Sequence, residues 1–203
     1  MAPNKNRKVS RHKSNKKLWL AIGIIAIIII AFGVYELIPT PPTKVLLQTS
    51  LGDVTIQLRT DKPITSGNFR NLVQQGKYDG TVFHRIIKGF MIQGGAINES
   101  IPTIHDEIGS NNTNVAYTIA MAKTSQPNSA TSQFFINVAD NGNIIIDNAG
   151  TKFDSVYTVF GTVISGQSVV DAIAKVPVTT NPYTGENSQA VQPVTLIKAT
   201  MVY

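Results

Sequence analysis

The chain has 203 residues, a formal net charge of +6 and 42% hydrophobic residues, which suits one ordinary domain with an additional segment. Seven of its 18 Lys and Arg residues lie in residues 1–17, whereas eleven basic and eleven acidic residues balance from residue 44 onward. The excess charge therefore belongs to the N-terminus, and nucleic-acid binding is not expected of the chain. The absence of cysteine excludes a disulfide framework and a lipid-modified cysteine anchor.

Residues 1–17 form a basic tail, and an 18-residue run without charge, Leu18 to Tyr35, follows it. Such a run would extend about 27 Å as a helix, close to the hydrocarbon thickness of a bilayer. We therefore predict a transmembrane helix over residues 18–38. A cleaved signal peptide is the alternative, although Ala31-Phe32-Gly33 is a poor cleavage site.

The basic tail predicts how this helix is oriented, because positively charged flanks stay in the cytoplasm. The remaining chain would then lie on the extracytoplasmic side of the cell membrane, as a single-pass protein. Residues 39–43, Pro-Thr-Pro-Pro-Thr, predict a short and stiff linker. Residues 44–203 are expected to form one domain held near the membrane surface.

The domain opens with the pattern of a β-hairpin over 44–49 and 54–59, in which Val54, Ile56 and Leu58 alternate with polar residues. A helix is expected from Thr65 or Ser66 to Gly76. Polar residues 96–114 predict a loop. Further strands are predicted over 81–95 (two, around Lys88-Gly89), 115–121, 133–138, 156–163 and 194–203, and a second helix over 165–175. This order of elements predicts a mostly β domain, an antiparallel barrel or sandwich with helices at its ends.

The stretch from Phe83 to Gly95, Phe-His-Arg-Ile-Ile-Lys-Gly-Phe-Met-Ile-Gln-Gly-Gly, is unusual because it sets an Arg among apolar residues. Arg is seldom placed so without a partner, and no partner of Arg85 is evident from the sequence. A barrel strand whose Arg85 points to solvent is the alternative interpretation of this stretch alone.

Two later motifs favour a functional interpretation: Ser-Ala-Thr-Ser-Gln-Phe-Phe-Ile-Asn at 129–137 and Val-Phe-Gly at 159–161. In this order and spacing, the three stretches resemble the cyclophilin family of peptidyl-prolyl isomerases over residues 44–203. The resemblance implies a closed eight-stranded antiparallel barrel capped by two α-helices, with the active groove on its outer side. It also implies proline-containing polypeptides as partners, and we expect the domain to be monomeric.

The chemistry implied by this resemblance is rotation about an X-Pro bond, whose barrier is about 18 to 20 kcal/mol because amide resonance must be broken. No bond to a heavy atom forms or breaks, so neither metal nor cofactor is expected, only a surface that prefers the twisted amide. The resemblance makes Arg85 the catalytic donor to the prolyl nitrogen. A noncatalytic proline-peptide binding module or holdase is the alternative function.

The same resemblance implies a set of groove residues. The expected substrate-binding residues are Phe90, Met91, Gln93, Ala122, Lys123, Gln133, Phe135, Phe153 and Tyr157. Phe90, Met91 and Phe135 would hold the proline ring, and Gln93 would hold a substrate carbonyl. Lys123 stands where Asn is common in the family, which is tolerable if the backbone carries the role.

One edge of the expected groove departs from the family, since many members carry a Trp before Val-Phe-Gly. Two alignments put either Lys152 or Ile145 at that position, and neither side chain supplies an indole N–H. The expected consequence is weak cyclosporin binding. Outside the groove, His84 is expected to be a packed barrel residue, and His105-Asp106-Glu107 to be solvated rather than to bind a metal.

Overall fold

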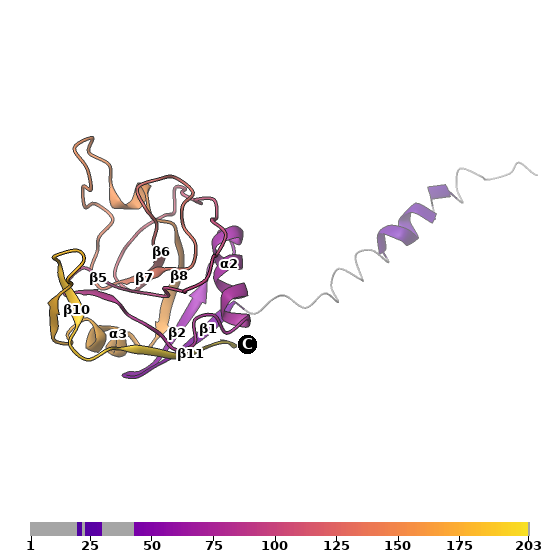
Figure 1. Ribbon diagram of the computed structural model, residues 1–203. Helices are drawn as coiled ribbons and strands as arrows, with labels where there is room; N and C mark the ends of the chain where they lie inside the picture. The colour runs from indigo at the N-terminus through magenta and orange to yellow at the C-terminus, as the bar shows by residue number, and fades with distance from the viewer. Residues whose placement is uncertain (1–19, 22, 30–42, 203) are drawn as a thin grey trace, which may run out of the picture. The chain divides into compact units, whose positions relative to one another are not determined.

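The computed structural model describes residues 20–21, 23–29 and 43–202 (Figure 1). The chain divides into two units, residues 1–41 and 42–203. In the first unit, residues 20–21 and 23–29 are helical. Among the described residues, none of the helices combines the length and apolar character that a membrane crossing requires. The predicted basic tail, much of the predicted anchor and most of the linker lie outside the described residues.

The second unit is built on one curled antiparallel sheet (Figure 1). Its order is β3-β11-β1-β2-β8-β6-β7-β5-β4. The strands are β1 (Lys44–Thr49), β2 (Gly52–Leu58), β3 (Thr81–Val82), β4 (Arg85–Ile87), β5 (Met91–Gly94), β6 (Thr118–Met121), β7 (Phe134–Asn137), β8 (Val159–Ser165) and β11 (Thr195–Val202). The predicted hairpin of the first two strands is confirmed, as is the break at Lys88-Gly89, where Gly89 adopts a positive φ of 72°.

The expected closed eight-stranded barrel is not confirmed. The main sheet has nine strands and ends at β3 and β4, which are edges of the sheet and not hydrogen-bonded neighbours. Both edges are short because residues 81–95 divide into three strands with a break at Phe83-His84. A separate hairpin of β9 (Val178–Thr180) and β10 (Asn187–Ala190) lies against β4. The result is a curled half-barrel.

Two α-helices within residues 43–202 agree with the prediction, α2 (Pro63–Gln74) and α3 (Gln167–Ile173). Helix α2 packs against β11 and β8, and α3 packs against β2. The start of α2 differs from the prediction, because Pro63 occupies its first turn and Thr65 lies inside the helix. The carboxylate of Glu107 accepts hydrogen bonds from the Thr65 N–H (2.7 Å) and hydroxyl (2.6 Å), so a distant residue caps this helix.

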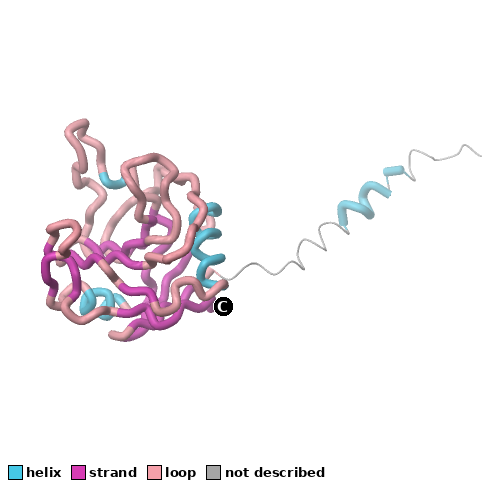
Figure 2. Tube along the Cα trace, viewed as in Figure 1, coloured by secondary structure: helices cyan, strands magenta, loops and turns pink. Residues whose placement is uncertain are grey.

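Other element bounds differ by a few residues, and the loops are long (Figure 2). Strands β6 and β8 begin three residues later than predicted. Left-handed backbone at Tyr117, with φ 66°, precedes β6, and the short 3-10 helix η1 (Phe153–Ser155) and a turn precede β8. The β9–β10 hairpin was not predicted, although the Asn181-Pro182 pair between its strands is a turn signal.

The sheet carries apolar side chains on both of its faces, and they form two separate clusters. In β7, Phe134 and Ile136 belong to the main core, whereas Phe135 between them belongs to a second, smaller cluster. Because strand side chains alternate between faces, one run of apolar residues supplies both the packed interior and the floor of an outer groove.

Candidate active site

The outer face of four neighbouring strands forms the floor of a groove. Gln93 of β5 lies opposite Phe135 of β7, which lies opposite Ala120 of β6, which lies opposite Val159 of β8. Apart from Gln93, these residues belong to the smaller apolar cluster, which also includes Phe153 of η1. The floor is therefore fixed by strand register and not by loop conformation.

A pocket of about 260 Å³ opens over this floor. It is lined by Arg85, Phe90, Met91, Gln93, Ala122, Lys123, Phe135, Ile146, Phe153 and Tyr157. The structure thus brings together all of the predicted site residues except Gln133. Gln133 lines an adjoining hollow, and its Oε1 accepts a hydrogen bond of 2.9 Å from the Gln93 Nε2.

Four aromatic rings form one wall of the pocket. The Phe153 ring lies 5.5 Å from Phe90, 5.6 Å from Phe135 and 4.5 Å from Tyr157 between centroids. Phe135 and Tyr157 form a fourth ring pair, with 5.5 Å between centroids. All of these pairs except Phe153–Tyr157 meet edge to face, an arrangement that the ring quadrupoles favour. The wall offers apolar surface of the kind that suits a proline ring.

Arg85 lines the same pocket from β4, and its guanidinium carbon lies 6.0 Å from the centroid of the Phe90 ring. The structure shows a partner for it that was not evident from the sequence: Glu186, 101 residues later in the chain. The Arg85 Nε donates to Glu186 Oε2 at 2.6 Å, and Nη2 donates to Oε1 at 2.8 Å. The hydrogen bonds from Arg85 hold the pKa of the Glu186 carboxyl below its ordinary value, so this carboxylate is ionised at neutral pH.

The edge of the groove expected to hold a Trp is built by a projecting loop. Ile145 and Lys152, the two alternatives from the alignments, face each other as a β-bridge across this loop. The pocket is lined instead by Ile146, beside them. Lys152 and Ile145 thus lie on the two sides of one hairpin-like loop, and a third residue, Ile146, lines the groove at this edge.

Comparison with known proteins agrees with this geometry. Residues 44–201 match the family described as cyclophilin type peptidyl-prolyl cis-trans isomerase/CLD. The chain belongs to the cyclophilin family. A peptidyl-prolyl cis-trans isomerase of Acinetobacter baylyi is 44% identical over 162 residues, 76% of this chain and 83% of the relative. One of Streptomyces antibioticus is 42% identical over 164 residues, 77% of this chain and 97% of the relative.

Solved structures show the same fold. A crystal structure of a Cryptosporidium parvum cyclophilin type peptidyl-prolyl cis-trans isomerase matches with a TM-score of 0.66 at 23% identity, covering 80% of this chain and 99% of the other. The family match and the relatives above 40% identity show that the present chain is a peptidyl-prolyl cis-trans isomerase.

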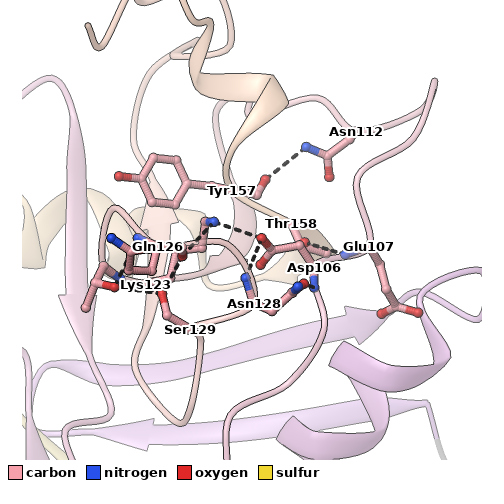
Figure 3. A network of polar contacts seen from close by, with 10 residues as sticks. Asp106, Glu107, Asn112, Lys123, Gln126, Asn128, Ser129, Tyr157 and Thr158 are labelled. Atoms are coloured by element: carbon pink, nitrogen blue, oxygen red, sulfur yellow. Dashed lines mark hydrogen bonds and ion pairs between the residues drawn. The ribbon is translucent and has the colours of Figure 1, made fainter.

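In this cyclophilin, the Lys123 side chain does not face the groove as a free charge. It is only 6% exposed, and its Nζ donates to Asp106 Oδ2 at 2.8 Å and to the Gln126 carbonyl at 3.3 Å (Figure 3). Asp106 also accepts from the Asn128 N–H at 3.0 Å. Because the ammonium is engaged, the backbone of Lys123 is the part that the groove wall can offer to a peptide.

The segment that carries Phe153 and Tyr157 is held by an asparagine, Asn112, that the motifs did not indicate. Asn112 Nδ2 donates to the carbonyls of Asp154 (2.6 Å) and Tyr157 (2.9 Å; Figure 3). Its Oδ1 accepts from the Val159 N–H at 2.8 Å. An Asn-rich loop gave no signal beyond its polarity, so these contacts could not be assigned in advance.

The expectation that the acidic residues of His105-Asp106-Glu107 are solvated is wrong. Asp106 pairs with Lys123, and Glu107 caps α2. Their carboxylates therefore organise the loops around the groove. His84 is partly buried, and burial holds the pKa of its imidazole below the ordinary value, so the ring is neutral at neutral pH.

Proposed function

We propose that this cyclophilin isomerises X-Pro bonds in exported or cell-surface polypeptides, with Arg85 as the donor that stabilises the twisted prolyl amide. The observation that carries the mechanism is the position of Arg85, whose side chain lines the same pocket as the aromatic wall, with the guanidinium carbon 6.0 Å from the centroid of the Phe90 ring. A proline ring against that wall would bring its nitrogen toward the guanidinium. That nitrogen regains its lone pair when the amide twists, so a donor there favours the transition state over either planar isomer.

The other groove residues would hold the peptide while one end rotates. The Gln93 Nε2 donates a hydrogen bond of 2.9 Å to Gln133 Oε1, and this bond would orient the Gln93 amide toward a substrate carbonyl. The backbone of Ala122 and Lys123 would hydrogen-bond an extended chain. Each ~1.4 kcal/mol of selective stabilisation gives a tenfold gain in rate, so a few such contacts suffice for catalysis.

The substrate class is supported by the aromatic lining of the pocket, which offers apolar surface to a proline ring. Among the fold relatives, the Cryptosporidium parvum enzyme was also crystallised in the presence of the dipeptide Ala-Pro. We expect the purified full chain to accelerate cis-to-trans isomerisation of a proline tetrapeptide, measured by NMR exchange. Binding of the peptide without acceleration would instead indicate the noncatalytic module or holdase.

The cellular context rests on residues 1–43 and is a separate part of the proposal. The uncharged run from Leu18 to Tyr35 and its basic flank support an uncleaved anchor with the domain outside. Protease added to spheroplasts is expected to digest the domain, while the membranes retain the N-terminal fragment. A soluble mature protein that begins near residue 34 would establish a cleaved signal peptide.

Weak cyclosporin binding is expected because an aliphatic side chain, Ile146, takes the groove edge where an indole would offer a donor and a broad face. Ile146→Trp should therefore tighten binding, measured by isothermal titration calorimetry. Trp at Ile145 or at Lys152 serves as the comparison, since neither residue lines the pocket. If the unmodified protein binds as tightly as Trp-bearing cyclophilins, the explanation is wrong.

A further inference from the structure

The ion pair between Arg85 and Glu186 has a geometry that bears on how the groove works. Both bonds lie along one edge of the guanidinium, through Nε and Nη2. An Arg side chain has five N–H donors, so this pairing leaves three, two on Nη1 and one on Nη2. Arg85 lines the pocket, and the carboxylate therefore holds one edge while the other stays available to a substrate.

Glu186 is well placed to act as a fixed anchor. It is the last residue of the turn between β9 and β10, directly after Gly185, whose φ is 71°. Its carbonyl accepts a hydrogen bond of 2.8 Å from the Asn181 N–H, and its own N–H donates to Thr184 Oγ1 at 3.3 Å. Strand β10 in turn lies against β4, which carries Arg85. The backbone of Glu186 is thus hydrogen-bonded within a hairpin that packs against β4, the strand that carries Arg85.

We propose that Glu186 is a positioning residue for the isomerase, holding the guanidinium of Arg85 with its free edge toward the prolyl nitrogen. The inference rests on the proposed role of Arg85. A long Arg side chain loses rotamer entropy when it is ordered, and a donor ordered before the substrate arrives does not lose that entropy again in the transition state. The opposing effect, partial neutralisation of the Arg85 charge, is reduced by solvent because both side chains are 35% exposed.

The test is a kinetic comparison of full-length variants at saturating and subsaturating peptide. Glu186→Gln keeps the shape but loses the charge and one acceptor, and we expect kcat to fall about tenfold with KM changed less than about twofold. Glu186→Asp keeps the carboxylate and should recover part of the loss. Asp61→Asn is the matched control, because Arg59 donates to Asp61 through the same edge (Nε, 2.9 Å; Nη2, 2.6 Å) outside the pocket, and kcat should stay unchanged.

A double-mutant cycle separates positioning from a general role of the hairpin. In an Arg85→Ala background, Glu186→Gln should cause no further loss of kcat, because the group that it positions is gone. An unchanged or increased kcat in Glu186→Gln, or an equal loss in both backgrounds, would overturn the positioning role. Near-normal kcat in Arg85→Ala alone would overturn the proposed mechanism itself, so the two failures are distinguishable. Thermal melts of every variant report whether the fold is retained.

Discussion

Replacing Arg85 by Ala is expected to lower kcat by at least roughly a hundredfold, about 2.7 kcal/mol of barrier. The side chain lines the pocket together with the aromatic wall, and its proposed contact strengthens only when the amide twists. The stability of the domain should change much less, because the Arg85–Glu186 pair is 35% exposed on both sides and such pairs contribute little. Stopped-flow isomerisation and urea unfolding measure the two effects separately.

Arg85→Lys tests whether orientation of the donor matters beyond its charge. Lysine keeps the charge but replaces the planar fork with a compact ammonium on a flexible stem, which cannot pair along one edge with Glu186 and present another edge to the groove. We expect Lys to recover only a minor part of the lost rate, with peptide affinity changed less than turnover. Near-normal turnover of a folded Arg85→Ala variant would contradict the assignment and favour the binding module.

The floor of the groove was accessible from the sequence because strand geometry is local. In the Phe134-Phe135-Ile136 run, alternate side chains face opposite sides of the sheet, and register places Phe135 against Gln93. The motifs supplied what periodicity could not, namely which face carries the chemistry. Most of the predicted pocket residues converge because they lie on paired strands or next to their ends, whereas Phe153 and Tyr157 come from η1 and the bend after it.

The features that could not be predicted from the sequence depend on contacts between segments that are distant in the chain. Glu186 reaches Arg85 across 101 residues, from a hairpin whose strands are only three and four residues long and mostly polar. Glu107 caps α2 from more than forty residues away, so the helix needed no capping side chain of its own at its start. One edge of the half-barrel is the short strand β4, which packs against the β9–β10 hairpin. The composition of that hairpin does not distinguish it from a loop.

Phe153→Ala is expected to destabilise the domain by about 3 kcal/mol and also to impair the groove, since truncation of a buried Phe typically costs 3 to 5 kcal/mol. The ring is 5% exposed and touches three other aromatic rings. It belongs to the small cluster under the groove and not to the main core, which places the expected cost at the lower end of that range. Urea denaturation gives the change in the free energy of unfolding.

A pair of milder substitutions separates the two roles of Phe153. Phe153→Leu removes from the aromatic wall the ring that contacts the other three. Phe160→Leu makes the same change in the main core, where Phe160 packs 5.0 Å from Phe69 between ring centroids. Both variants should lower the free energy of unfolding. For folded protein, only Phe153→Leu should lower kcat/KM, by about tenfold, because its ring lines the pocket. Equal kcat/KM in the two variants would mean that the aromatic wall serves stability and does not hold the proline ring.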